Sequence, residues 1–266
     1  MTPSFSYQTI PESRIATFDT FSAGMLRHHV AAILEFDVTD SRKKLQELRK
    51  NGTNISFNGW LLRVIGMTLK NHPEASAFLY SKRKLLIFDD INISIMIEKK
   101  INGNKVPVPV VIEKTNEKSA LEITAEIEAA KNSEMGSGDI VINRKRSFSE
   151  RVYYHLPGFL RRLTWSLILR NPHFAYKKMG NVIVTSLGMT GRINGWFIHR
   201  SIHPVSFGIG SVLKKPVVTG NEIKIREILN MTILIDHDVI DGAPMVRLLN
   251  ELTRCIGNGE GILPSA

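Results

Sequence analysis

One junction in the last quarter of the chain constrains the fold more than any other stretch, because a buried-strand pattern passes there directly into a helix pattern. Residues 228–235 form an almost unbroken apolar run, which predicts a strand inside a sheet. After residue 242, apolar side chains recur at helical spacing on Met245, Leu248 and Leu252. A strand that runs at once into an amphipathic helix predicts a sheet with helices packed against it.

The junction itself carries residues suited to chemistry. His237 follows the strand, Asp241 comes four positions later, and Gly242 comes next. Side chains at such junctions are held on a rigid support at the end of a sheet. Histidine has the ordinary pKa nearest neutral pH, so His237 is a candidate general base. The alternative is a purely structural histidine at a strand end. We expect Gly242 to allow the turn into the helix.

The rest of the chain alternates between helix and strand patterns. Residues 1–24 are expected to form an N-terminal arm with a short helix, and the prolines within 106–112 indicate an edge strand. Asp40 or Ser41 is expected to cap one helix, and Ser56 the next. Strands are expected at 28–38, within 77–98, and at 106–112, 181–186, 205–212, 222–225 and 228–235; helices are expected at 41–51, 56–72, 117–132, 159–170 and 243–255. Intermixed helices and strands, with a hairpin signal at Asn102 and Gly103, predict an α/β fold in which helices cover a mixed sheet.

A length of 266 residues suits one large domain or two small ones, and the composition, with 43% hydrophobic and 23% charged residues, is that of an ordinary globular protein. No apolar run approaches the roughly 20 residues that span a bilayer. The N-terminus lacks the charged and apolar parts of a signal peptide. Cys255 is the single cysteine, and its apolar setting predicts a buried, unreactive thiol. These features predict a cytoplasmic protein.

The net charge of +10 raises the question of an anionic partner. Nucleic acid is one such partner, but the basic residues are spread along the chain without a recognition-helix, zinc or aromatic-platform motif. We therefore expect no nucleic-acid partner. The histidines other than His237 show no metal-ligand spacing, and no glycine-rich phosphate loop follows a strand. We expect neither a metal nor nucleotide hydrolysis.

Several segments together resemble a known family. Residues 236–244 resemble the HxxxDG signature of the dihydrolipoamide acyltransferases, the core enzymes of 2-oxo acid dehydrogenase complexes. Chloramphenicol acetyltransferase shares the histidine and aspartate of that signature and the fold. Residues 182–189 resemble the family's strand and turn of the form TISNLG. Further similarity lies in residues 29–39, 92–97, 106–111, 118–123 and 206–216, and the resemblance runs from about residue 14 to 258.

The resemblance implies a chloramphenicol acetyltransferase-like fold and one catalytic domain over residues 1–266. It implies transfer of an acyl group between coenzyme A, whose phosphates suit a basic surface, and a thiol acceptor such as dihydrolipoamide. In that chemistry His237 is the general base and Thr185 the hydroxyl that stabilises the oxyanion, with Ser186 as the neighbouring alternative. Asp241 would orient the loop, through Arg14 or Arg27. A Thr185 that is only a strand residue is the alternative to its catalytic role.

The family also implies a homotrimer in which His237 of one subunit meets Thr185 of its neighbour. Two other functions remain open at this point. One is acetyl transfer to a small hydroxyl acceptor, and the other is a catalytically idle trimer that serves as a scaffold or regulatory subunit.

The sequence departs from the family in three places. Asp238 stands where many members have arginine, which reverses the charge beside His237. We expect no lipoyl or subunit-binding domain before the catalytic domain, so the acceptor is a separate small molecule or a lipoyl group on another chain. Residues 133–180 form a longer, more basic insertion. Its helix over 159–170 is expected to pack against protein, either its own domain or a neighbouring subunit; the alternative is docking on a membrane surface or a partner.

Overall fold

A computed structural model of the chain describes residues 3–10, 13–101, 104–133, 148–186 and 193–263. Its centre is a mixed six-stranded sheet with the order β1-β8-β7-β6-β4-β5. β6 runs parallel to both β4 and β7, and the other neighbouring pairs are antiparallel. The strands are β1 (His29–Asp37), β4 (Ile93–Ile101), β5 (Asn104–Ile112), β6 (Val182–Ser186), β7 (Val205–Thr219) and β8 (Glu222–Asp236). β2 (Phe78–Ser81) and β3 (Lys84–Leu86) form a separate small hairpin.

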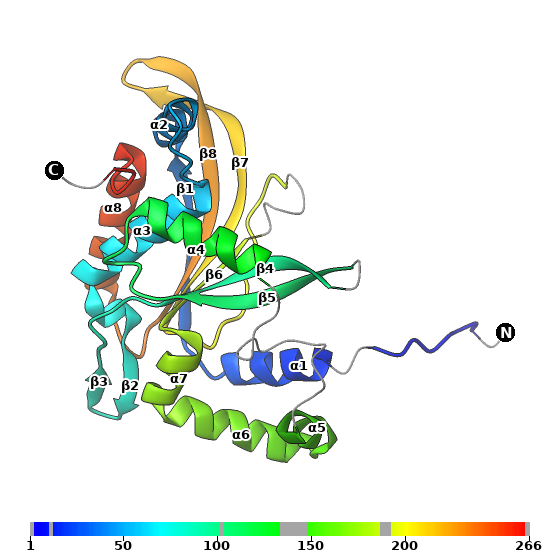
Figure 1. Cartoon of the computed structure of the whole chain (residues 1–266). Coiled ribbons are helices and arrows are strands. Elements are labelled where there is room, and N and C mark those ends of the chain that lie inside the picture. Colours follow the sequence, from blue (N-terminus) through cyan, green and yellow to red (C-terminus); the bar gives the residue numbers. More distant parts are fainter. Residues whose placement is uncertain (1–2, 11–12, 102–103, 134–147, 187–192, 264–266) are drawn as a thin grey trace.

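Helices cover one face of the sheet, as the sequence predicts (Figure 1). They are α2 (Thr39–Lys50), α3 (Phe57–Asn71), α4 (Ala120–Asn132) and α8 (Gly242–Asn258), with a 3-10 turn at Pro73–Ser76 after α3. α3 begins where expected, since the Ser56 hydroxyl accepts a hydrogen bond from the Gly59 backbone N–H at 3.0 Å. Gly59 is also required for packing, because a Cβ there would lie 2.2 Å from Thr124 Oγ1 on α4.

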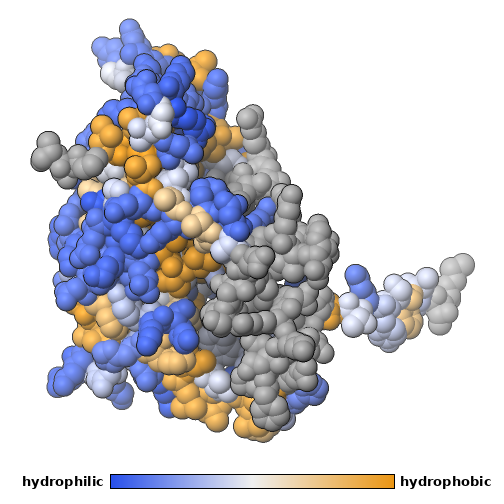
Figure 2. Space-filling view, viewed as in Figure 1, coloured by the Kyte–Doolittle hydropathy of each residue, from blue (hydrophilic) through white to orange (hydrophobic). Residues whose placement is uncertain are grey.

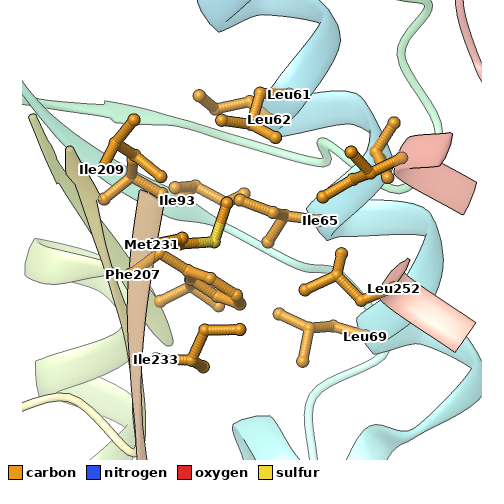
Figure 3. Close-up of a cluster of buried hydrophobic side chains, with 14 of the residues drawn as sticks. Leu61, Leu62, Ile65, Leu69, Ile93, Phe207, Ile209, Met231, Ile233 and Leu252 are labelled. Atoms are coloured by element: carbon orange, nitrogen blue, oxygen red, sulfur yellow. The ribbon is translucent and has the colours of Figure 1, made fainter. Parts of the chain in front are cut away.

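The hydrophobic core lies between this helical layer and the sheet. Figure 3 shows side chains of α3 and α8 pointing at those of the central strands. Full burial of each large apolar side chain stabilises the fold by roughly 1.5–3 kcal/mol. The cluster includes Leu61, Ile65 and Leu69 of α3, Leu252 of α8, Ile93 of β4, Phe207 and Ile209 of β7, and Met231 and Ile233 of β8. Cys255 belongs to it, and burial raises the pKa of its thiol to about 11, as expected of an unreactive cysteine.

Three local expectations are wrong. The strands expected at 222–225 and 228–235 are one continuous strand, β8, paired along its length with an extended β7. α2 begins at Thr39, whose N–H and hydroxyl both donate to Asp37, and Ser41 instead donates to the Ile256 carbonyl at 2.7 Å. Gly242 does not have a positive φ, so the turn into α8 does not require glycine there.

The insertion forms a second helical layer with the N-terminal helix (Figure 1). α1 (Ser13–Gly24) packs against α6 (Gly158–Arg170), which is flanked by α5 (Phe148–His155) and α7 (Pro172–Met179). A polar network joins α1, α5 and α6. Tyr153 of α5 and Arg161 of α6 donate to the buried Asp19 of α1 at 2.7 and 2.8 Å. Trp165 of α6 donates to Tyr153 at 3.0 Å.

Part of the apolar surface of α6 is not packed in the single chain, although Leu160 and Ile168 are half-buried. Phe159, Leu163 and Leu167 are exposed, although the expected packing relied on them. Apolar residues accordingly reach the lower edge of the molecule in the space-filling view, where α6 runs (Figure 2). None of the helices in the described ranges is both long and apolar enough to cross a bilayer.

Candidate functional site

His237 is the first residue after β8. It lies at the end of the β1–β8 pair, at one edge of the sheet. His29 of β1 pairs with Asp236 of β8. One residue further along, the His237 backbone N–H donates to the His28 carbonyl at 3.0 Å. The His237 side chain is exposed and has no hydrogen-bond partner among the described residues. The backbone is therefore fixed while the imidazole stays available to a second molecule.

A buried ion pair holds the turn that carries His237. Arg27 donates to Asp236 at 2.9 Å, and the Asp236 side chain is fully buried while 16% of the Arg27 side chain is exposed. The other oxygen of Asp236 accepts from the Asp238 backbone N–H at 3.2 Å. The same carboxylate thus binds the segment before β1 and the turn after β8.

This arrangement corrects the expected partner of Asp241. Arg27 pairs with Asp236 rather than Asp241, and the guanidinium of Arg14 lies over the Phe18 ring at 5.9 Å. Asp241 is exposed at the N-terminus of α8, where its carbonyl accepts from the Met245 N–H but its side chain makes no capping bond. Its carboxylate has no partner among the described residues of one chain.

Asp238, which replaces the usual arginine, pairs with a second histidine. Its two carboxylate oxygens lie 2.9 and 3.0 Å from His28 Nδ1. The hydrogen bond and the negative charge of Asp238 raise the pKa of His28 above its ordinary value. Both side chains are exposed, so the pair adds a titratable charge beside His237 at the surface.

Thr185 lies near the end of β6, on the sheet face that α3 and α8 do not cover. It pairs with Gly208, whose neighbours Phe207 and Ile209 point into the helix-facing core. Because side chains alternate between the faces of a sheet, Thr185 points to the opposite, open face. Thr185 is half-buried. Ser186 pairs with Ile209 and so lies on the core side, which makes it the poorer hydroxyl donor at this face.

The sheet register separates Thr185 from His237 within one chain. Val182, Val205 and Ile235 lie level across β6, β7 and β8. Thr185 lies three positions beyond this level in β6, and His237 lies two positions beyond it in the opposite direction, since β8 is antiparallel to β6. At about 3.3 Å per residue, with strands about 4.8 Å apart, the two Cα atoms are roughly 19 Å apart. A hydrogen-bonded site needs groups about 3 Å apart, so one chain cannot bring these two side chains together.

A segment that was not predicted from the sequence covers part of the open face. From residue 193 to 203 the chain crosses β7, β8 and β1 without forming a strand. Trp196 Nε1 donates to the Leu34 carbonyl at 3.0 Å, and His203 Nε2 donates to the Met179 carbonyl at 3.0 Å. His199 lies over Gly208. The only signal for this segment in the sequence is its density of aromatic and histidine residues outside any strand or helix pattern.

Neither a metal site nor the main depression of the surface coincides with His237 and Thr185 in the described ranges. Within the described ranges, no three or more histidine, cysteine, aspartate or glutamate side chains gather in a way that could hold a metal ion. A depression of about 890 Å³ lies on the helical side, lined by residues such as Lys44, Arg63 and Glu260. Neither His237 nor Thr185 lines it, so it is separate from the candidate site.

Comparisons with known proteins agree on one family. A family model described as 2-oxoacid dehydrogenases acyltransferase (catalytic domain) matches residues 13–136 and 177–263. The unmatched stretch between them holds α5 and α6, which lie in the insertion noted in the sequence. The acetyltransferase component of the pyruvate dehydrogenase complex of Staphylococcus epidermidis is 25% identical over 244 residues, which are 88% of this chain and 47% of that protein. The chain thus spans about half the length of that relative.

Solved structures confirm the expected fold class. A probable dihydrolipoamide acetyltransferase from Listeria monocytogenes superposes with a TM-score of 0.67 at 19% identity, over 98% of this chain and 97% of that one. The dihydrolipoamide acetyltransferase of Azotobacter vinelandii gives a TM-score of 0.67 at 17% identity, over 97% and 94% of the two chains. That structure was studied for the catalytic roles of a serine, a histidine and an asparagine.

Proposed function

Since the chain belongs to the 2-oxoacid dehydrogenase acyltransferase family, by its catalytic domain, we propose that it transfers an acyl group between coenzyme A and a thiol acceptor such as dihydrolipoamide. The acceptor is either a small molecule or a lipoyl group. In this proposal His237 is the general base, Thr185 the oxyanion donor and Asp241 an orienting residue. A serine, a histidine and an asparagine were studied in the Azotobacter vinelandii enzyme. This chain has the histidine and a hydroxyl, on Thr185, but Asp241 offers a carboxylate rather than an amide.

The proposed reaction needs no further reactant, because every proton and bond change is accounted for by the two thiols, the thioester and these side chains. His237 takes the proton of the attacking thiol, and the thiolate sulfur forms a bond to the thioester carbonyl carbon. The carbonyl oxygen becomes an oxyanion, to which the Thr185 hydroxyl donates; one such donor stabilises the transition state by about 2.7–4 kcal/mol. Collapse of the intermediate breaks the original carbon–sulfur bond, and the leaving thiolate recovers the proton from His237. An ordinary imidazole accepts a proton from an ordinary thiol at a cost of roughly 2.7 kcal/mol.

The observation that carries this proposal is the separation of the two halves of the site. His237 is exposed at one end of the central strands, and Thr185 lies on the open face roughly 19 Å away. A second subunit is the simplest source of the missing half, because His237 of one copy can reach Thr185 of the next. We therefore propose a homotrimer with one site at each interface.

Exposed apolar side chains support an interface on this side of the chain. β1 is an edge strand of the sheet, and Ile33 on it is exposed on the open face, since it pairs with Thr232. Phe21 of α1 and Ile198 of the crossing segment are exposed as well. Edge strands and apolar patches of this kind are normally covered in soluble proteins. A second copy of the chain would cover them.

The direct test is to incubate the protein with acyl-CoA and to measure free coenzyme A with dihydrolipoamide or a small alcohol as acceptor. We expect turnover with the thiol and much slower turnover with the alcohol. Turnover confined to the alcohol would replace the proposal by acetyl transfer to a hydroxyl. A folded trimer inert with a broad set of acyl-CoAs would favour the scaffold function.

A further inference from the structure

A row of residues crosses the open face of the sheet at the level of Thr185. Thr185 of β6 pairs with Gly208 of β7, and Gly208 pairs with Thr232 of β8. Directly paired residues point to the same face, so the two threonine hydroxyls lie on either side of a glycine. The glycine leaves room between them for a side chain from elsewhere in the chain.

The imidazole of His199 fills that room. A Cβ built on Gly208 would lie 2.8 Å from His199 Nδ1 and 3.2 Å from the Phe197 ring. On its other side, His199 Nε2 lies 2.9 Å from Ser206 Oγ. The ring is thus fixed by Ser206, with Nδ1 placed over Gly208 in the row between Thr185 and Thr232.

Two polar atoms of this row are not satisfied by the part of the chain that the structure describes. His199 Nδ1 and Thr232 Oγ1 are buried and have no hydrogen-bond partner there. Buried polar atoms without partners are rare in native proteins, so the free nitrogen of the His199 ring calls for an explanation. Burial also lowers the pKa of His199 to about 4, so the imidazole is neutral at neutral pH. A neutral imidazole has one N–H donor and one acceptor nitrogen.

We infer that His199 is a positioning residue for Thr185. The Ser206 hydroxyl donates to His199 Nε2, which leaves the proton of the neutral ring on Nδ1. The Nδ1–H donates to Thr185 Oγ1, and the hydroxyl proton of Thr185 is thereby directed toward the thioester oxygen. This inference rests on the proposed function, because it needs Thr185 to be the oxyanion donor.

The geometry allows this contact without a change in the sheet. Neighbouring strands are about 4.8 Å apart, so Thr185 Cβ lies about that distance from the position that a Gly208 Cβ would occupy. His199 Nδ1 is 2.8 Å from that same position. A rotation of the Thr185 hydroxyl and a small tilt of the ring would then have to close the remaining gap between Nδ1 and Oγ1, and catalytic hydrogen bonds often shorten only when substrate binds.

Two substitutions separate the two ring nitrogens. The amide nitrogen of His199→Asn takes the place of Nδ1 and gives up the contact with Ser206. The amide of His199→Gln takes the place of Nε2 and gives up the contact with Thr185. We expect His199→Gln to lower kcat by about 10–100-fold with KM within about twofold, as for a group that acts mainly in the transition state. His199→Asn should retain more activity than His199→Gln.

A double mutant and a matched control complete the test. Since His199 acts through Thr185, adding His199→Gln to Thr185→Val should cause little further loss, whereas independent roles would multiply. Thr232→Val, on the other side of the ring, should keep near-wild-type kcat. Equal activities of the Asn and Gln variants, additive losses in the double mutant, or wild-type turnover in folded His199→Gln would each overturn the inference.

A nitrogen NMR measurement distinguishes failure of this inference from failure of the proposed function. We expect the His199 ring of the wild-type protein to be neutral at pH 7 with its proton on Nδ1, and Thr185→Val to shift the Nδ1 resonance more than Thr232→Val does. A proton on Nε2 would overturn the inference whatever the turnover. An active wild-type enzyme in which Thr185→Val has no effect would instead refute the role proposed for Thr185, and the inference with it.

Discussion

The two halves of the proposed site are held in opposite ways. His237 is an exposed side chain on a turn that is fixed by a buried ion pair beneath it. Thr185 is half-buried in the sheet, beside a glycine and a neutral imidazole. The base is therefore free to reach a second molecule, whereas the oxyanion donor is part of a rigid, partly covered surface. A single chain therefore holds both His237 and Thr185 in place, but it does not bring them together into one site.

The largest expected effect falls on the exposed half. His237→Ala should lower kcat by about 10²–10⁴-fold, the usual contribution of general acid–base catalysis. The melting temperature should stay close to wild type, because the His237 side chain is exposed and makes no hydrogen bond with the described residues. His28→Ala is the matched control, since it removes another exposed histidine from the same end of the sheet. Unchanged turnover in folded His237→Ala would remove His237 from the mechanism.

The ion pair between Arg27 and Asp236, which holds the turn that carries His237, should contribute to the stability of the fold. Arg27→Met leaves the buried Asp236 carboxylate without its cation, and the loss of one partner of a buried ion pair costs about 3–5 kcal/mol of stability. Urea unfolding at neutral pH would measure this as a lower midpoint. Arg14→Met removes an arginine that lies over an aromatic ring and should cost much less. Equal stability of the two variants would show that the Arg27–Asp236 pair does not hold the turn.

Thr185→Val tests the buried half with little change in shape. Loss of one oxyanion donor should lower kcat by about 10²–10³-fold, while Thr185→Ser, which keeps the hydroxyl, should retain most of the activity. Steady-state kinetics with saturating acyl-CoA would measure both. If Val and Ser at this position behave alike, the hydroxyl is not the donor.

The smallest effect concerns the charge beside His237. Asp238 raises the pKa of His28 above the ordinary value near 6.5. A raised pKa in the folded state stabilises the fold below the ordinary pKa, and this stabilisation is lost as the pH rises through the folded-state pKa. Asp238→Asn should therefore lower the His28 pKa, which an NMR titration would show. A titration midpoint that does not move would contradict the pairing of Asp238 with His28.

Much of the fold follows from local pattern. The apolar periodicity of α3 and the cap at Ser56 predicted that helix, and the apolar run before His237 predicted the core half of β8. The outer half of β8 was not predicted as continuous, because charged residues such as Lys224, Arg226 and Glu227 interrupt its apolar pattern. That half is a strand because it pairs with the extended β7, and such pairing between strands is not a local property.

The site shows the same limit more sharply. His237 and Thr185 were predicted from motifs, but their separation depends on the register of three strands, which no motif states. Arg14 or Arg27 was expected to bind Asp241, but Arg27 binds Asp236, because the choice depends on which carboxylate is buried. His199 was missed because Gly208, over which it lies, and Thr185, which pairs with Gly208, come together only in the folded sheet.

Mixed trimers test the central claim, that each site takes His237 from one subunit and Thr185 from the next. His237→Ala and Thr185→Val chains with different affinity tags would be produced together, and trimers that carry both tags would be purified. In a cyclic trimer with head-to-tail interfaces, every such mixed trimer has one interface with an intact pair, so we expect about one third of wild-type turnover. Homotrimers of either variant should remain nearly inert. Mixed trimers as inactive as the two parents would contradict the account, because a site contained within one chain cannot be restored by its neighbour.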